Sequence, residues 1–312
     1  MDKLSIIVPC YNEEESIRLF YDEVEKQVLP VEKEYIFIND GSRDNTLNEL
    51  RKLAKEDSRV RYESFTRNFG KEAGLYAGLV KATGNLVVVM DVDLQDPPEM
   101  LEEMITTLTS SNEYDCVGTR RTTRDGEPVI RSFFAKGFYK LINKISDTEI
   151  VDGARDYRMM SRQMVDSILL LTENNRFSKG IFSWVGYKTK YLEYKNVERV
   201  AGTTSWNFWG LFKYSLDGIV DFSEAPLNVA SLFGIFSCIL SFLMAIFLGV
   251  RTIIFGDPTS GWTSLIVVIL AIGGIQLFCM GIIGKYVGKI YKEAKNRPVY
   301  LVKEDELSNP LK

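Results

Sequence analysis

Short apolar runs alternate with amphipathic segments over residues 4–119. The runs of strand type are 4–10, 35–40, 60–65, 85–91 and 114–119. The segments between them repeat apolar side chains at helical spacing, at 13–28, 44–57, 71–84 and 97–111. This order predicts an α/β domain with a largely parallel sheet that helices cover on both faces. In such a sheet, ligands bind at the carboxyl ends of the strands.

Two much longer apolar runs follow, at 228–250 and 258–284, and neither contains Asp, Glu, Lys or Arg. Each exceeds the roughly 20 residues that a helix needs to cross about 30 Å of hydrocarbon. The alternative is a pair of buried helices in a soluble core, which the length and the absence of charge disfavour. The short polar connection around Asp257 suits a loop outside the bilayer. The sequence therefore predicts a transmembrane hairpin.

Charge around the hairpin predicts its orientation. Five basic residues follow the second run, namely Lys285, Lys289, Lys292, Lys295 and Arg297. The opposite loop has one Arg and one Asp, so the positive-inside rule places both termini and the N-terminal domain in the cytosol. The first residues are too acidic for a signal peptide. We therefore expect a multi-pass protein of the cell membrane. Its parts would be a cytosolic domain at 1–205, an aromatic-rich interfacial segment at 206–227, the hairpin at 228–287 and a cytosolic tail at 288–312.

Composition narrows the chemistry. The 312 residues include no histidine, so Ser-His-Asp sites, Cys-His sites and histidine-bearing metal sites are excluded. The four cysteines are far apart and form no zinc spacing. Acid–base and metal chemistry must therefore use carboxylates, Lys, Tyr or Cys. The net charge of −4 argues against a nucleic-acid partner.

Carboxylates follow two of the predicted strands. Asp91 and Asp93 lie on the same side of a strand end, where they repel each other unless a cation lies between them. A divalent ion, Mg²⁺ or Mn²⁺, with diphosphate oxygens completing its shell would resolve this conflict. The alternative is a solvated loop in which Asp96 caps the next helix. Asp40 could accept the imide N–H of a uracil, with Tyr11 beside the base, or could simply belong to a turn.

Basic residues recur in the later loops and suit a phosphate-binding wall, although solvated surface charge would also explain them. They include Arg67, Lys71, Arg120, Arg121, Arg124 and Arg131. The stretch 151–162 is expected to place Asp152, Arg155, Asp156 and Arg158 in a short loop before a helix. Arg199 opens a small-residue loop before the aromatic segment.

Together these motifs resemble the family 2 inverting glycosyltransferases of GT-A fold. The similarity lies with the polyisoprenyl-phosphate branch, which includes dolichyl-phosphate mannose synthases and bactoprenol glucosyltransferases. The motifs that carry it are VPCYNEEE, INDGSRDNT, RNFGKEAG, MDVDLQDPPE, GARDYRMMSR and RVAGTTSW, followed by the two apolar runs. The resemblance extends from Leu4 to about Arg297.

The resemblance implies a Rossmann-like GT-A domain and assigns roles to individual residues. The implied nucleotide-sugar-binding residues are Pro9, Tyr11, Glu13, Asp40, Lys71, Asp91, Asp93, Gln95 and Arg199. Asp91 and Asp93 would hold the Mg²⁺ or Mn²⁺ ion, and Arg120 and Arg131 would bind the acceptor phosphate. The implied catalytic residues are Asp156, Asp93 and Arg158. We assign Asp156 and Arg158 to the acceptor because their motif lies beyond the predicted core strands.

The implied reaction is inverting transfer of a hexose, glucose in the first instance, from a UDP-sugar to undecaprenyl or another polyisoprenyl phosphate, which gives a β-linked product. UDP-GlcNAc and GDP-mannose remain alternative donors. A processive synthase would need more spans and a Q-x-x-R-W-type motif. A non-catalytic scaffold or flippase partner would leave the strand-end carboxylates unexplained. The resemblance also makes membrane lipid, further copies of the chain and a flippase candidate partners.

Overall fold

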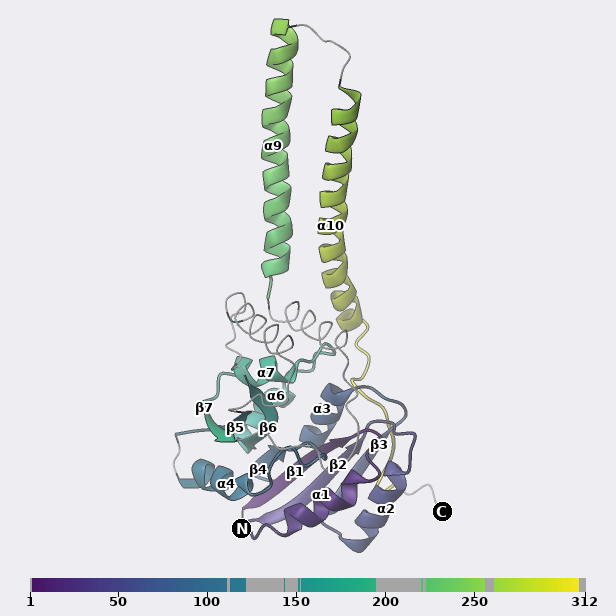
Figure 1. Cartoon of the computed structure of the whole chain (residues 1–312). Coiled ribbons are helices and arrows are strands. Elements are labelled where there is room, and N and C mark those ends of the chain that lie inside the picture. Colours follow the sequence, from purple (N-terminus) through teal and green to yellow (C-terminus); the bar gives the residue numbers. More distant parts are fainter. Residues whose placement is uncertain are drawn as a thin grey trace.

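The computed structural model describes residues 2–110, 113–121, 143, 151, 153–194, 220, 223–255 and 261–308. An α/β body carries two long helices that project away from it (Figure 1). The strands are β1 Lys3–Cys10, β2 Glu32–Asn39, β3 Val60–Phe65, β4 Leu86–Val89, β5 Cys116–Arg121, β6 Ala154–Ser161, β7 Thr189–Tyr194 and β8 Val302–Asp305. The helices of the body are α1 Ser16–Glu25, α2 Thr46–Glu56, α3 Lys71–Lys81, α4 Met100–Ser110, α6 Arg162–Leu169 and α7 Ser178–Trp184.

The eight strands form one mostly parallel sheet in the order β7-β5-β6-β4-β1-β2-β3-β8. β1 pairs in parallel with β2 and β4, β2 with β3, and β5 with β7. β6 runs antiparallel between β4 and β5, and β8 runs antiparallel to β3. The predicted α/β class is thereby confirmed. The carboxyl ends of β1, β2 and β4 and the amino end of β6 consequently meet at one edge of the sheet.

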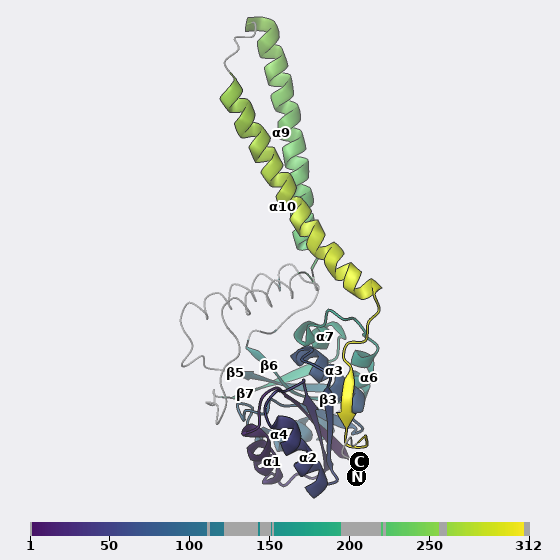
Figure 2. The same cartoon turned by 90° about the vertical axis from the view of Figure 1, so that its right-hand side faces the viewer.

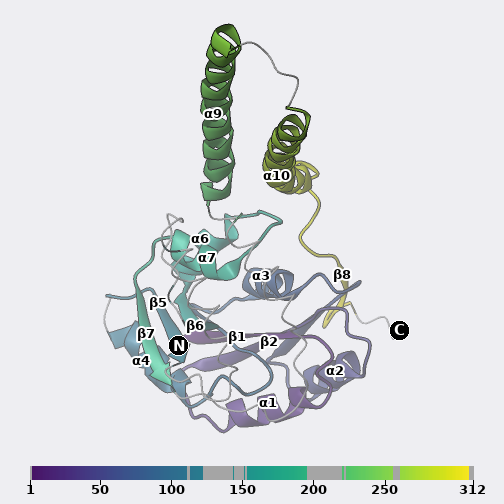
Figure 3. The same ribbon diagram turned by 45° about the horizontal axis from the view of Figure 1, so that its top comes forward.

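Helices cover both faces of the sheet, as the alternating pattern predicts. The buried side chains of α1, α2 and α4 pack with one face, and those of α3, α6 and α7 pack with the other. Helix α3 approaches β1 so closely that a Cβ on Gly78 would lie 2.1 Å from the Cγ2 atom of Ile7. Figures 1 and 3 show α6 and α7 between the sheet and the projecting helices.

Two helices begin three residues later than the sequence pattern predicts. The amide of Ser16 donates to the carbonyl of Glu13 in a turn, and α1 starts only at Ser16. A similar turn joins the amide of Met100 to the carbonyl of Pro97, so α4 starts at Met100. The apolar periodicity indicates each helix correctly, but it does not distinguish a first helical turn from a preceding tight turn.

The expected loop around Asp156 is wrong, because Ala154–Ser161 forms the central strand β6. Its Arg158 pairs with Val89 of β4 on one side and Gly118 of β5 on the other. Charged residues at the amino end of the strand hide the apolar alternation on which strand prediction depends. This motif therefore belongs to the core of the sheet, beside the strand that precedes Asp91, and does not lie beyond it.

The two apolar runs form the long helices α9 Ala225–Phe255 and α10 Trp262–Ala294, which lie side by side (Figures 1 and 2). Segments of both helices, at 225–244 and 271–294, are long and apolar enough to cross a bilayer. Almost none of either segment is buried inside the protein. This exposure argues against the alternative of two helices buried in a soluble core, since large side chains such as Phe236 and Leu277 face outward.

The chain beyond α10 returns to the α/β body. Strand β8 adds to the edge of the sheet beside β3, and the buried carboxylate of Glu304 accepts hydrogen bonds from both Nε and Nη2 of Arg51, at 2.8 and 2.6 Å. Glu293, near the end of α10, accepts the backbone N–H groups of Asn174 and Asn175 at 2.9 Å. Residues 288–308, expected to be part of a tail, therefore include the end of α10 and a strand of the sheet. The end of α10 and the chain after it are anchored to the α/β body at two places, through Glu293 and through β8.

Candidate active site

The loops after β1 and β2 are joined by short polar contacts. The amide of Asn12 donates to the hydroxyl of Ser42 at 2.9 Å, and the amide of Arg43 donates to the side-chain oxygen of Asn12 at 2.9 Å. Asn12 adopts a left-handed backbone with φ of 55°, which asparagine tolerates better than most residues. These contacts give the two loops a shared, fixed shape at the carboxyl ends of their strands.

Asp40 holds the loop that precedes α3. Its two carboxylate oxygens accept the backbone N–H groups of Phe69 at 2.6 Å and Gly70 at 2.9 Å. Burial raises the pKa of Asp40, while these two amides and the Arg67 guanidinium oppose that shift. The neighbouring Gly41 has φ of +64°, and a Cβ there would lie 2.4 Å from the backbone of Arg67. Glycine at this position thus permits the close approach of the two loops. The assignment of Asp40 to a uracil stays a prediction.

Lys71, the first residue of α3, links two carboxylates from different strands. Its Nζ atom lies 2.7 Å from Oδ1 of Asp91 and 2.8 Å from Oδ2 of Asp156. Burial alone would lower the pKa of Lys71, but these carboxylates raise it well above its usual range. Burial alone would raise the pKa of Asp156, but Lys71, Lys179 and Arg155 hold it well below its usual range. Lys71 and Asp156 are therefore both charged at neutral pH.

Asp96 and Arg155 extend this group on its buried side. Oδ2 of Asp96 accepts the backbone N–H of Asp91 at 3.0 Å, so Asp96 stabilises the turn after β4 rather than capping a helix. Arg155 lies 3.8 Å from the carboxylate of Asp91 and 3.9 Å from that of Asp96. Burial and the nearby Asp91 raise the pKa of Asp96 to about 7. We call Lys71, Asp91, Asp96, Arg155 and Asp156 the carboxyl-end cluster.

Asp93 and Gln95 lie in the same turn after β4. The amide of Gln95 donates to Oδ1 of Asp93 at 3.2 Å, and Leu94 between them has a left-handed backbone with φ of 57°. The side chain of Asp93 is buried, whereas that of Asp91 is partly exposed. Asp91 is therefore the more accessible of the two predicted metal ligands.

The oxygen donors of this turn suit a hard divalent ion. Carboxylate oxygens are preferred by Mg²⁺ and Mn²⁺, and the predicted pair Asp91 and Asp93 comes from one short turn. Within the described ranges, no group of three or more Asp, Glu or Cys side chains is placed to hold an ion. Two carboxylates fill only part of the shell of such an ion, which leaves positions for oxygens of a bound phosphate compound.

Arg158 lies on the same strand as Asp156 but makes different contacts. Only 3% of its surface is exposed, and its guanidinium carbon lies 4.0 Å from the centre of the Phe182 ring. Its Nη2 atom donates to the carbonyl of Arg155 at 3.1 Å. These contacts stabilise the junction between β6 and α7. The assignment of Arg158 to catalysis is untested by this geometry and stays a prediction.

Three further predicted nucleotide-site residues, Pro9, Tyr11 and Glu13, lie at or just after the end of β1. Pro9 pairs with Ile38 within the sheet, and Tyr11 is exposed directly after the strand. The carboxylate of Glu13 accepts a hydrogen bond from the hydroxyl of Ser16 at 2.8 Å, so it also orders the start of α1. These positions are at the same edge of the sheet as the carboxyl-end cluster.

Of the predicted phosphate-binding arginines, Arg120 is exposed near the end of β5, where it pairs with Ala154 at the start of β6. Arg120 therefore lies beside the amino end of β6, the strand that carries Asp156. Arg131 and Arg199 fall outside the described residues, as do Asp152 and the aromatic segment before residue 220.

Glu72 and Ser178 make a polar contact next to the carboxyl-end cluster that the sequence does not predict. Glu72 accepts hydrogen bonds from the backbone N–H of Ser178, at 2.9 Å, and from its hydroxyl. Burial raises the pKa of Glu72, and the Ser178 hydroxyl acts against that shift. The contact fixes the start of α7, and therefore Lys179, next to α3. No short-range signal in the sequence joins residues this far apart.

Comparisons with known proteins identify the family to which the chain is similar. The family model described as "Glycosyl transferase family 2" matches residues 5–169. The chain is 44% identical to the SfII prophage-derived bactoprenol glucosyl transferase of Shigella flexneri, over 99% of this chain and 100% of that protein. It is 43% identical to the prophage bactoprenol glucosyl transferase homolog of Escherichia coli strain K12, over 96% and 98%. A solved glucosyl-3-phosphoglycerate synthase from Mycobacterium tuberculosis covers 70% of this chain and 78% of its own, with 19% identity and a TM-score of 0.48.

Proposed function

The chain belongs to glycosyl transferase family 2 and is a glycosyltransferase, and we propose that it transfers glucose from UDP-glucose to a polyisoprenyl phosphate. In a bacterial membrane this acceptor would be undecaprenyl phosphate. The observation that carries the proposal is full-length similarity at 43–44% identity to proteins named bactoprenol glucosyl transferase. Similarity over 99% of the chain includes both long apolar helices as well as the α/β body.

The carboxyl-end cluster supports binding of the donor diphosphate. Asp91 and Asp93 would hold a Mg²⁺ or Mn²⁺ ion, which would supply charge neutralisation for the leaving nucleoside diphosphate. Lys71 lies beside Asp91 and supplies a further positive charge at the same strand end. The left-handed turn at Leu94 and the Asp96 contact to the Asp91 amide keep these groups in place before a donor binds.

The acceptor chemistry needs orientation more than proton removal. A phosphate monoester has a second pKa near ~6, so its oxygen is already largely ionised at neutral pH. Asp156 is held charged by Lys71 and would orient the acceptor or its cationic partners rather than take a proton. Arg120, with Arg131, would bind the acceptor phosphate. A single in-line displacement by the phosphate oxygen would invert the anomeric carbon and give a β-linked lipid-phosphate sugar.

Helices α9 and α10 would bring this chemistry to the membrane surface. Their exposed apolar side chains suit contact with lipid, and the chain after α10 pairs with β3 of the α/β body. The basic residues that follow the second apolar run would lie on the cytosolic side, together with the body and both termini. The acceptor phosphate would then meet the protein at the cytosolic face.

The test is a donor panel with purified full-length protein in detergent or vesicles. UDP-glucose, UDP-GlcNAc and GDP-mannose are each offered with undecaprenyl phosphate, and released nucleotide and lipid-linked sugar are measured. We expect release of UDP from UDP-glucose that depends on the lipid phosphate. Preferential transfer of GlcNAc or mannose would show that the transferred sugar is not glucose. No lipid-dependent release from any donor would favour a non-catalytic scaffold.

A further inference from the structure

Lys71 occupies the position of a cation between two carboxylates that the proposed function uses. Its ammonium lies 2.7 Å from Asp91 and 2.8 Å from Asp156, so one positive charge serves both. Asp91 is also the predicted ligand of a divalent ion. A divalent ion on Asp91 would therefore meet an ammonium on the same carboxylate, and like charges a few ångströms apart repel strongly in a partly buried site.

The backbone of Lys71 is fixed independently of these ion pairs. Gly70, directly before it, has φ of +100°, and its amide is held by the carboxylate of Asp40. Only the long, flexible side chain reaches Asp91 and Asp156. The ammonium can therefore leave the two carboxylates without any movement of α3.

Lys81, at the other end of α3, is also paired with two carboxylates, but in an enclosed position that suits a structural role. Its ammonium lies 3.4 Å from Glu63 and 3.0 Å from Glu306, with only 7% of its side chain exposed. The side chain of Lys71 is 36% exposed. A ligand can therefore reach Lys71 from solvent, whereas Lys81 is enclosed by its partners.

We propose that Lys71 is an internal counter-ion that keeps a divalent ion off Asp91 until a nucleoside diphosphate enters the site. This inference rests on the proposed function. The diphosphate oxygens would offer the ammonium new partners, and Asp91 would become available to the ion at the same moment. Ion and donor would then bind cooperatively, each raising the affinity for the other. Lys71 acts here as a positioning residue, which controls the order in which the site fills.

The test measures binding of Mn²⁺ by electron paramagnetic resonance, with and without UDP, so it does not depend on turnover. For the wild-type protein we expect weak binding of Mn²⁺ alone and much tighter binding with UDP. In Lys71→Gln, Mn²⁺ alone should bind about tenfold more tightly or better, because the nearer cation is gone and the more distant Arg155, 3.8 Å from Asp91, remains. The strengthening by UDP should shrink in the same variant, since the diphosphate loses its ammonium partner.

Two further variants separate this role from a merely structural one. Lys71→Arg keeps a cation at the site, so Mn²⁺ alone should bind as weakly as in the wild-type protein. Lys81→Gln removes a lysine paired with two carboxylates at the far end of the same helix and should leave the affinity for Mn²⁺ unchanged. Thermal melts of every variant establish that the protein is folded at the temperature of the titration.

Unchanged or weaker binding of Mn²⁺ alone by folded Lys71→Gln would overturn the counter-ion role. If that result accompanied normal sugar transfer by the wild-type protein, the proposed function would stand and only this inference would fail. A wild-type protein that bound neither UDP nor Mn²⁺ would instead contradict the proposed function itself.

Discussion

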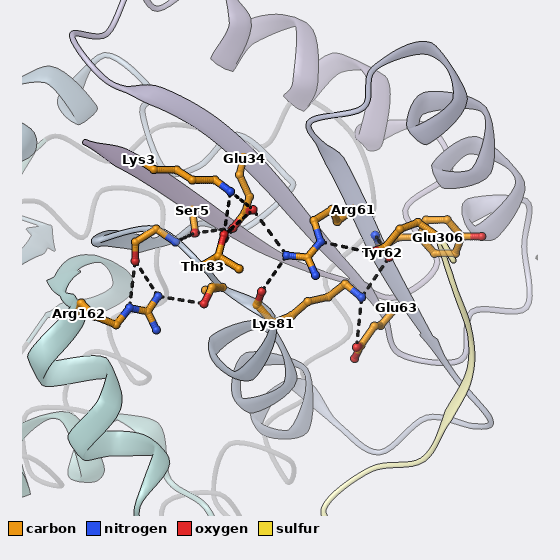
Figure 4. Close-up of polar contacts among 12 residues, drawn as sticks. Lys3, Ser5, Glu34, Arg61, Tyr62, Glu63, Lys81, Thr83, Arg162 and Glu306 are labelled. Atoms are coloured by element: carbon orange, nitrogen blue, oxygen red, sulfur yellow. Dashed lines mark hydrogen bonds and ion pairs between the residues drawn. The ribbon is translucent and has the colours of Figure 1, made fainter. Parts of the chain in front are cut away.

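The parallel strands carry a polar cluster at each end, and the two clusters differ in how fully their carboxylates are occupied. At the amino ends, Glu34 of β2 accepts hydrogen bonds from Lys3, from the hydroxyl of Ser5 at 2.7 Å and from the amide and hydroxyl of Thr83 (Figure 4). Nη1 of Arg61 lies 3.5 Å from Oε2 of Glu34. We call these residues the amino-end cluster. Only 4% of the Glu34 side chain is exposed, so this carboxylate has no room for a ligand.

The carboxyl-end cluster has the opposite character. The side chain of Asp91 is 25% exposed, and its oxygens lie near two cationic side chains, Lys71 and Arg155, rather than a ring of backbone amides and hydroxyls. Partners on long side chains can be exchanged for a ligand, whereas the backbone amide of Thr83 beside Glu34 cannot. We therefore propose that exchangeable partners, more than charge itself, distinguish the ligand-binding end of this sheet.

A hollow in the surface does not by itself indicate where a ligand binds. A hollow of about 600 Å³ lies beside the amino-end cluster and is lined by several charged residues, including Lys33, Arg59 and Glu34. The central carboxylate there is already satisfied: burial alone would raise the pKa of Glu34, but hydrogen bonds from Lys3, Ser5 and Thr83 lower it to about 2. We therefore interpret that cluster as structural, and the following predictions test the contrast between the two ends.

The largest effect is expected for Asp91→Asn. Loss of this carboxylate should lower kcat/KM for sugar transfer about a thousandfold, because several kcal/mol of charge stabilisation by the ion disappear. Chelation of divalent ions should abolish activity of the wild-type protein reversibly. Steady-state assays with added Mg²⁺ or Mn²⁺ measure both effects, and Asp22→Asn on the exposed face of α1 is the matched control. Full activity of Asp91→Asn in excess chelator would exclude the metal role.

Glu34→Gln should affect stability rather than catalysis. The pKa of Glu34 is about 2 in the folded protein against an ordinary 4.5, so its ionised form stabilises the fold by about 3 kcal/mol. That contribution is complete above pH 4.5 and is lost as the pH falls towards 2. Denaturant unfolding at pH 7 and at pH 3 should show a difference in stability between wild type and variant that falls to roughly half or less at pH 3. Glu32→Gln, which alters an exposed residue of the same strand, is the control.

Asp156→Asn tests whether, within the carboxyl-end cluster, Asp156 serves the reacting acceptor rather than binding of the donor. We expect kcat to fall about a hundredfold, as for loss of an orienting charge at the reacting centre, while affinity for the UDP-sugar changes little. Calorimetric titration of the donor, followed by turnover assays across lipid concentrations, distinguishes the two. Collapse of donor binding with near-normal turnover at saturating donor would contradict the assignment of Asp156 to the chemistry.

The smallest effect is expected for Arg120→Gln, at the exposed end of β5. Loss of one charged hydrogen-bond donor should raise KM for the lipid phosphate about tenfold and leave KM for the donor unchanged. Arg18→Gln, on the exposed surface of α1, is the comparison. An equal change in both KM values would place Arg120 outside the acceptor site.

The sequence predicts the carboxyl-end site better than it predicts the sheet. Asp91 and Asp93 follow an uninterrupted apolar strand, so their place at a strand end can be deduced from local pattern. Strand β6 escapes prediction because Arg155, Asp156 and Arg158 interrupt its apolar alternation. Arg158 is buried and the other two are partly buried, and their contacts with Phe182, Asp91 and Lys71 come from distant parts of the chain.

Strand β8 escapes prediction for a different reason. Its four residues, Val302–Asp305, are mostly charged and too short to show a period. They pair because the chain returns from α10 to the open edge of β3, where the carboxylate of Glu304 meets Arg51. The failures at β6 and β8 concern long-range ion pairs, which no local pattern in a single sequence reveals. The sequence analysis also omits β7, a short strand at the other edge of the sheet.

The central claim is that sugar transfer takes place at the carboxyl ends of the strands. The most direct test is release of UDP from UDP-glucose in the presence of undecaprenyl phosphate, measured for wild type, Glu34→Gln and Asp91→Asn below their melting temperatures. We predict that wild type and Glu34→Gln release UDP at the same rate per folded molecule and that Asp91→Asn stays near background. Equal activity of Asp91→Asn and wild type, or loss of activity in folded Glu34→Gln alone, would contradict the claim.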